Sequence, residues 1–582
     1  MGLFSRTEQE KKKQSPANDK ALTALGVLSG LSLPFKKTDN NNLSRKVIIK
    51  HLELYNKFPI RLLEESAKVL QNMNRALIKP KQRNELAELL TSYIYPLVLS
   101  WYEKYQAQEN SLPESSERRN ALIASIDAIQ QLSVTYKLLF REYYSDDNKK
   151  YNNLAYQYAA RSLELIRVEQ RLRALRYQKL PKVSWQHSNQ IFFSQAHHNA
   201  IDDDYVLIGL LGVRKESDKL RRGGTPKSSL RKLYISIQLF GLLDVTTWPT
   251  RMFHVPDAYL DLLAGKGLKV MADNGQALNP GFLLTHYRSD KPPVFKRADN
   301  LPAPVIKLDY TTLYNLLVKD HKEIGKQQFL ATFDESKFSR PLADIKDIDR
   351  VPVIELLIMG LTSRERRQKR HASFDDSGLS VYFGFHEANR LLKDIVAPDQ
   401  VRVREARQFI DTLAMSSALL VDERKDHKSA NWTISNFSTG GLLISTEETD
   451  FSSPIQIDML VLFTMPDNHQ HPILGFVRRL NRPSSKQVEI AIVRLSNYAE
   501  TAGVQDEGEV GTLHAKAVIL IKDVRGEWNL VVKTSMHYLP GQPLKLIRAN
   551  GSTLPVRLGE VVYTKKDFKV FELRSPGLEV VK

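Results

Sequence analysis

The chain contains no cysteine among its 582 residues. It therefore has no disulfide, no thiol nucleophile, no thiolate-held iron–sulfur cluster and no cysteine-based zinc site. The sequence also lacks a nucleophile elbow, a zincin histidine pair and a Walker phosphate loop. We accordingly expect a protein that is not an enzyme, with no catalytic residue, no metal ion and no cofactor. The lack of cysteine fits a reducing compartment, so we expect a cytoplasmic location.

Long apolar runs are missing as well. The uncharged stretch from Ala21 to Phe35 has 15 residues, which is short for a membrane span of about 20. Two interpretations of residues 1–45 remain open. They form a flexible basic arm that leads into the first helix, or the arm makes a peripheral contact with an acidic membrane surface.

Positive charge is in excess. Eighty-four Lys and Arg stand against 66 Asp and Glu, a net charge of +18. This balance favours anionic partners, namely nucleotides, nucleic acid or acidic membrane surfaces. The length predicts about three to four domains.

Residues 46–185 are expected to form a helical bundle, because apolar side chains recur there at steps of three and four. A break is expected near Pro80. In the helix expected from Leu154 to Arg176, arginines take the polar positions. We expect these arginines to form a solvated face with Glu164 and Glu169 as partners.

Residues 186–345 are expected to be a mixed α/β region. The apolar runs from Tyr205 to Val213 and from Leu233 to Val245 have strand-like chemistry. The stretch from Asp309 to Lys322 is expected to be helical. No chemistry can be assigned to this region.

From about residue 430 the apolar period becomes two, which indicates strands. Short strands separated by turn residues are typical of β-barrels or sandwiches. We expect a first β-barrel over residues 346–505, with a helical insert from Glu387 to Leu419. A second small β-barrel module is expected over residues 506–582. The predicted fold class is therefore multidomain α+β, with an N-terminal helical bundle, a mixed middle region and C-terminal antiparallel β-barrels. The predicted strands of the last module are Ala517–Ile521, Trp528–Lys533, Pro543–Ile547, Pro555–Tyr563 and Phe568–Leu573.

One short segment concentrates basic charge. Residues 363–370 hold five basic residues and one acid, among them Arg366, Arg367 and Arg370. Arginine forks bind phosphate oxygens in pairs and also match the O6/N7 edge of guanine. The spacing of four between Arg366 and Arg370 lets both reach one ligand. The segment is followed by an expected strand from Ser380 to Phe385.

A second motif follows downstream at Asn436, Ser438 and Gly441. Asn and Ser stiffen turns through backbone hydrogen bonds, and paired glycines permit the close approach of a ligand. An Asn side chain in this position also meets a base edge. The preceding residues, Ala430 to Ser435, are expected to form a strand.

Together the two motifs resemble the PilZ family, small β-barrels that bind cyclic di-GMP. Arg366 and Arg370 match its RxxxR pattern, and Asn436, Ser438 and Gly441 match its [D/N]xSxxG pattern. The resemblance covers roughly residues 360–500. It implies a pocket in which the arginines hold phosphate and guanine and the second motif completes the site.

The resemblance further implies a receptor that converts cyclic di-GMP binding into a changed interdomain arrangement and the binding of a protein partner. The partner is left unidentified, and a homo-oligomer is left open. The alternative function is a nucleic-acid or acidic-membrane-surface binder that uses diffuse basic charge on a degenerate PilZ-like scaffold.

Overall fold

The computed structural model divides the chain into two compact units, one comprising residues 1–110 and 115–364 and the other residues 111–114 and 365–582. We call these the helical unit and the β unit. The finer domain boundaries expected from the sequence stay predictions. The structure describes residues 28, 43–108, 112–144, 152–196, 201–208, 227–244, 247–263, 269–273, 282–294, 305–327, 334–343, 345, 347–362, 371–372, 379–396, 432–438, 440–448, 454–465, 468–484, 486–506, 515–523 and 525–574.

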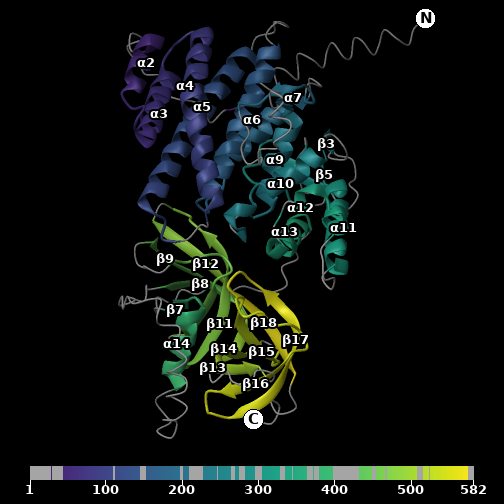
Figure 1. The fold of residues 1–582 in the computed structure, drawn as a ribbon. Helices are drawn as coiled ribbons and strands as arrows, with labels where there is room; N and C mark the ends of the chain where they lie inside the picture. The colour runs from purple at the N-terminus through teal and green to yellow at the C-terminus, as the bar shows by residue number, and fades with distance from the viewer. Residues whose placement is uncertain are drawn as a thin grey trace, which may run out of the picture. The chain divides into compact units, whose positions relative to one another are not determined.

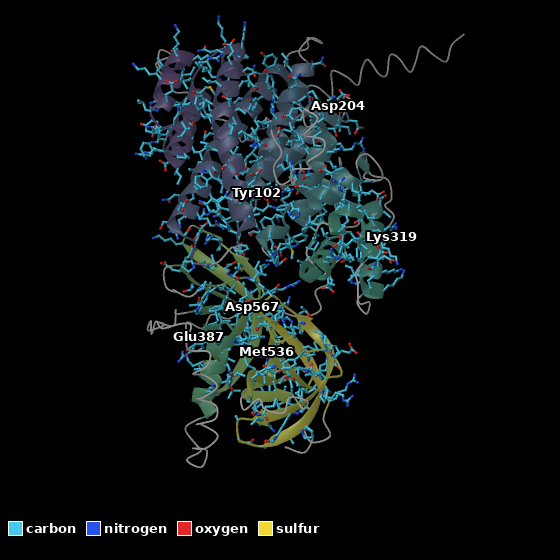
Figure 2. The ribbon with its side chains drawn as sticks, viewed as in Figure 1. Tyr102, Asp204, Lys319, Glu387, Met536 and Asp567 are labelled. Carbon is cyan, nitrogen blue, oxygen red and sulfur yellow. The ribbon has the colours of Figure 1, made fainter. Side chains whose placement is uncertain are left out.

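The helical unit begins with helices that pack around α5 (Figure 1). Their bounds are α2 Arg45–Glu53, α3 Pro59–Arg75, α4 Pro80–Ala107, α5 Ser116–Tyr144, α6 Asn152–Ala174 and α7 Lys182–Ala196. The expected break at Pro80 is confirmed, because α4 starts there with proline in its first turn, where the missing amide hydrogen has no helical partner to lose. Helix α5 contacts α3, α4 and α6, so most of its circumference is buried. Tyr102 of α4 is fully buried in this packing (Figure 2).

The expectation for the arginines of α6 is confirmed in part: Arg161 pairs with Glu164 and Arg173 with Glu169, but Arg167 and Arg171 do not form a solvated face. Arg167 and Arg171 are 8% and 1% exposed, and both pair with Asp257 at 3.0 Å. Asp257 also accepts a hydrogen bond from Ser236. Burial alone would raise the pKa of Asp257, but the charges of Arg167 and Arg171 hold it at about 2. The prediction failed because the carboxylate comes from α10, some 90 residues downstream.

The middle of the chain continues the helical unit. It contains the β1–β2 pair (Tyr205–Val206 and Lys227–Ser228), α9 (Leu230–Leu242), α10 (Val255–Leu262), a three-stranded antiparallel sheet of order β3-β5-β4 (Lys269–Asp273, Val305–Asp309 and Phe282–His286), α11 (Thr311–Gln327), α12 (Arg340–Ala343), α13 (Asp347–Gly360) and the 3-10 turns η5 (Thr250–Met252) and η7 (Glu335–Lys337).

Two expectations for this region meet different outcomes. The helix expected from Asp309 to Lys322 is confirmed as α11. The strand-like run from Leu233 to Val245 was predicted wrongly, because it lies mostly in α9, whose N-cap Ser229 accepts a hydrogen bond from the backbone of Lys232. Helix α9 is buried on nearly every side, and an apolar run of that kind carries no period that separates helix from strand.

The β unit holds a seven-stranded antiparallel sheet of order β6-β8-β9-β12-β11-β10-β7 (Figure 1). The strands are β6 His371–Ala372, β7 Ser380–Phe383, β8 Thr433–Ser438, β9 Gly441–Glu447, β10 Leu460–Met465, β11 Asn468–Asn481 and β12 Gln487–Arg494. An isolated bridge between Leu379 and Trp432, with an amide-to-carbonyl distance of 2.9 Å, joins the residue before β7, at one end of this sheet, to the residue before β8. Of the expected helical insert, the described part is α14, Phe385–Val396; residues 397–431 lie outside the described residues.

The second barrel is closed by six strands in the order β13-β14-β15-β18-β17-β16. They are β13 Ser496–Asp506, β14 Lys516–Asp523, β15 Trp528–Lys533, β16 Pro543–Arg548, β17 Thr553–Thr564 and β18 Phe568–Arg574. The segment after β15, which includes Met536, is tied to the β17–β18 turn by a hydrogen bond from the Thr534 amide to the Asp567 carbonyl (Figure 2). Leu462 and Phe476 of the sheet share a core with Ile519 and Val570 of the barrel.

The expected fold class, multidomain α+β with a helical N-terminal region and C-terminal barrels, is confirmed. Within the part of the chain that the structure describes, no helix combines the length and apolarity needed to cross a bilayer.

Candidate functional site

The second sequence motif forms the hairpin between β8 and β9. Asn436 and Ser438 lie in β8, and Gly441 is the first residue of β9. The strand expected over Ala430–Ser435 extends further than predicted, because β8 continues through Asn436 and Ser438. Their side chains therefore follow the alternation of a strand, which fixes the face of the sheet on which each one lies.

The register assigns Asn436 and Ser438 to the outer face of the sheet. Ile434 pairs with Ile444, and both are buried on the inner face. A β-bulge at Ser435 then shifts the register, so that Asn436 pairs with Leu443 and Ser438 with Gly441. Bulges re-aim side chains and are common next to binding sites. Asn436 and Ser438 are both half-buried.

Gly441 lies where the backbones of β9 and β12 leave no room for a side chain. A Cβ at this position would lie 2.1 Å from the carbonyl oxygen of Ile492 on β12. The hairpin is held there by a 3.0 Å hydrogen bond from the Arg494 amide to the Gly440 carbonyl and by a 3.3 Å bond from the Ser438 hydroxyl to the Gly441 carbonyl. Burial lowers the pKa of the half-buried Arg494 side chain. The glycine of the motif is therefore required by the packing of the strands themselves.

The three arginines of the first motif, Arg366, Arg367 and Arg370, lie outside the described residues. The next two residues of the chain are described as β6, which pairs with the motif strand: His371 lies opposite Phe437, and Ala372 lies opposite Asn436. Arg370 immediately precedes His371 in the sequence. The two motifs, 66 positions apart between Arg370 and Asn436, are thus linked through neighbouring backbone.

Sequence reasoning missed the residues that share the outer face with Asn436. The register places Leu443, Ala491 and Arg479 in one row with it, across β9, β12 and β11. Only the pairing of strands distant in sequence defines this row. The alternating pattern of β11 would have been the signal, but a second bulge, at Arg478, interrupts it.

No cluster of three or more His, Asp or Glu side chains suited to a metal ion occurs in the described ranges. Asn436, Ser438 and Arg479 bring amide, hydroxyl and guanidinium groups to this face. Such groups recognise phosphate oxygens and the edges of bases.

Residues 53–267 match the family model described as "Cyclic-di-GMP receptor FimW, N-terminal domain". Apart from residues 111–114, the matched range lies in the helical unit. It covers less than half of the chain and excludes both sequence motifs. Neither the curated proteins nor the solved structures that were searched contain a match. Over these residues the chain is therefore similar to the N-terminal domain of a cyclic di-GMP receptor.

Proposed function

We propose that this chain is a non-enzymatic receptor for cyclic di-GMP that binds the nucleotide at a PilZ-like site in its β unit. The ligand residues are Arg366, Arg367 and Arg370 on one side and Asn436, Ser438 and Gly441 on the other. The observation that carries the proposal is the pairing of β6 with β8, because it ties the chain directly after Arg370 to the strand that bears Asn436. The family match in the helical unit supports the same ligand independently of both motifs.

The chemistry of the site suits a cyclic dinucleotide that carries two negative charges and two guanines. Arg366 and Arg370 bind phosphate oxygens through charge-assisted forks, or the O6/N7 edge of a guanine. The Asn436 amide donates and accepts hydrogen bonds at a base edge, and the Ser438 hydroxyl does so at ribose or phosphate. Gly441 lets the ligand approach the hairpin backbone.

Binding is coupled to the rest of the protein through the arginine segment. The division between the helical unit and the β unit falls at residues 364 and 365, directly before Arg366. A ligand that fixes the arginines therefore constrains the connection between the units and changes their arrangement. The changed arrangement exposes or hides a surface for a protein partner in the cytoplasm. The comparisons give no support to a nucleic-acid or membrane-surface function.

Titration calorimetry with cyclic di-GMP tests the proposal. We expect saturable binding by the unmodified chain and its loss in Arg370→Ala and in Asn436→Ala, with circular dichroism unchanged. Arg525→Ala and Asn56→Ala are matched controls, because both residues are exposed and neither belongs to a motif; these variants should bind as the unmodified chain does. Absence of binding by the unmodified chain, or unchanged affinity in both site variants, refutes the proposed site.

A further inference from the structure

A row of four residues crosses the outer face of the sheet from the motif strand to β11. Asn436 pairs with Leu443, Leu443 with Ala491, and Ala491 with Arg479. Residues that pair directly across antiparallel strands project to the same face. All four are half-buried. We call this set the outer row.

Both ends of the outer row are built by β-bulges. On β8 the register shifts between Ile434 and Asn436, and on β11 it shifts between Val477 and Arg479. Val477 and Leu480 are fully buried on the inner face, so Arg478 and Arg479 both take outward positions between them. A regular strand would turn one of these two arginines into the core. The bulge on β11 thus keeps two adjacent cations on the face that carries Asn436.

The middle of the outer row is apolar. Leu443 and Ala491 lie between Asn436 and Arg479 in the row, and the side chain of Ala491 is a single methyl group. The neighbouring row on one side begins at Ser438 and Gly441 of the candidate site and runs on through Val493 to Phe476. Val493 and Phe476 pack in the core shared with the barrel, so the open part of this face ends there. The neighbouring row on the other side contains Glu489, which accepts a hydrogen bond from Asn481 at 2.7 Å. That carboxylate repels phosphate and limits where an anion can lie.

We infer that Arg479 is a specificity-determining residue of the nucleotide site and reads a guanine base that rests on Leu443 and Ala491. This inference rests on the proposed function. Three strand spacings of about 4.8 Å place the backbones of Asn436 and Arg479 about 14 Å apart, and the long Arg479 side chain shortens that gap. An apolar floor with polar groups at its rims is the usual form of a ligand site. A guanidinium fork matches O6 and N7 of guanine, whereas adenine presents an amino donor in place of O6.

The test compares the affinities for cyclic di-GMP and cyclic di-AMP, measured by titration calorimetry on the full-length chain. We expect Arg479→Ala to weaken cyclic di-GMP binding about tenfold or more and to change cyclic di-AMP binding much less. Arg479→Lys keeps the charge but loses the fork, so it should also lose discrimination between the two nucleotides. Arg478→Ala, one residue outside the outer row, should keep the discrimination.

The outcomes separate this inference from the proposed function. If the unmodified chain binds neither nucleotide, both are overturned. If Arg370→Ala and Asn436→Ala abolish binding but Arg479→Ala retains the affinity and discrimination of the unmodified chain, only the role of Arg479 is overturned. Equal losses in Arg478→Ala and Arg479→Ala, or full rescue by Arg479→Lys, indicate diffuse charge and also overturn it. Thermal unfolding of each variant shows that the fold is retained.

Discussion

The backbone amide of Glu114 donates a 2.9 Å hydrogen bond to Oε1 of Glu448, although 334 positions separate these residues in the sequence. Arg482 completes the cluster: its guanidinium bonds Glu448 through Nε and Nη2, and Nη1 lies 3.6 Å from the Glu114 carboxylate. All three side chains are buried. Leu112 pairs with Ile455 beside them, through bonds of 2.9 and 2.7 Å. Residues 111–114, which connect α4 to α5 in the sequence, therefore belong to the β unit.

Arg482→Leu should destabilise the protein by about 3–5 kcal/mol, because it leaves two carboxylates buried without their cation. Urea unfolding followed by the fluorescence of the tryptophans measures this change. Arg525→Leu, at an exposed turn, is the matched control and should change the free energy of unfolding by less than about 0.5 kcal/mol. A similar small change in Arg482→Leu would contradict a structural role for the cluster.

Gly441→Ala should cost about 3 kcal/mol of stability, the upper end of the range for overpacking. The added methyl group would lie 2.1 Å from the Ile492 carbonyl oxygen, which is backbone and cannot rotate away. The separation of β9 from β12 should also weaken cyclic di-GMP binding. Gly325→Ala gives the opposite sign, because that helical glycine has open space around it and alanine favours a helix by about 1 kcal/mol. Thermal unfolding of both variants decides the prediction.

Lys137 is a buried cation in the helical unit. It is 4% exposed on α5, and burial lowers its pKa to about 8, with partial compensation by the charge of Glu169. Glu169 itself accepts hydrogen bonds from Arg173, Gln130 and Ser184. Removal of the lysine charge would therefore leave Glu169 well partnered.

The lowered pKa of Lys137 predicts a pH dependence of folding. Below pH 8 the lysine is charged in both the folded and the unfolded chain, and the folded chain bears the full cost of burying that charge. Between pH 8 and 10.5 the folded chain releases the proton first, so this residue makes stability rise with pH. The difference between the ordinary value of 10.5 and about 8 corresponds to about 3 kcal/mol.

Lys137→Met should therefore stabilise the protein by about 3 kcal/mol at pH 7 and flatten the rise of stability from pH 8 to 10.5. Urea unfolding at a series of pH values gives both results. Lys68→Met, at an exposed position on α3, is the control and should leave the profile unchanged. A destabilised Lys137→Met variant with an unaltered pH profile would count against a charged, unfavourably buried lysine.

The sequence predicted the second barrel well, because its signals are local. The strand expected at Trp528–Lys533 has those bounds in the structure, and the strand expected from Phe568 ends one residue later than predicted. Alternating side chains and turn residues mark each strand locally, although two of the pairings, β13 with β16 and β15 with β18, join strands that are not consecutive in the chain. In the candidate site, the hairpin at Asn436 and Gly441 was predictable for the same reason.

The remaining features depend on contacts between distant parts of the chain. Arg167 and Arg171 can be buried because they pair with Asp257. No pattern in the sequence near α6 predicts that a residue so far downstream is their partner. The outer row depends on two bulges, each of which inserts one residue into an alternating pattern. A bulge reverses the face of every later side chain in a strand, so Arg479 could not be assigned to the ligand face from its position alone.

The motif strand β8 is secured unequally on its two sides. β9 pairs with it along its length, whereas the described pairing on its other side consists of His371, Ala372 and Leu379. Strands with few backbone hydrogen bonds open locally at a small cost in free energy. A nucleotide that contacts both β8 and the segment paired with it would suppress this opening. Hydrogen exchange of the Leu379 amide should then be slower in the bound state than in the free state. Under the proposed function, ligand binding would then be detected as increased rigidity between β8 and Leu379, even without a change in the rest of the sheet.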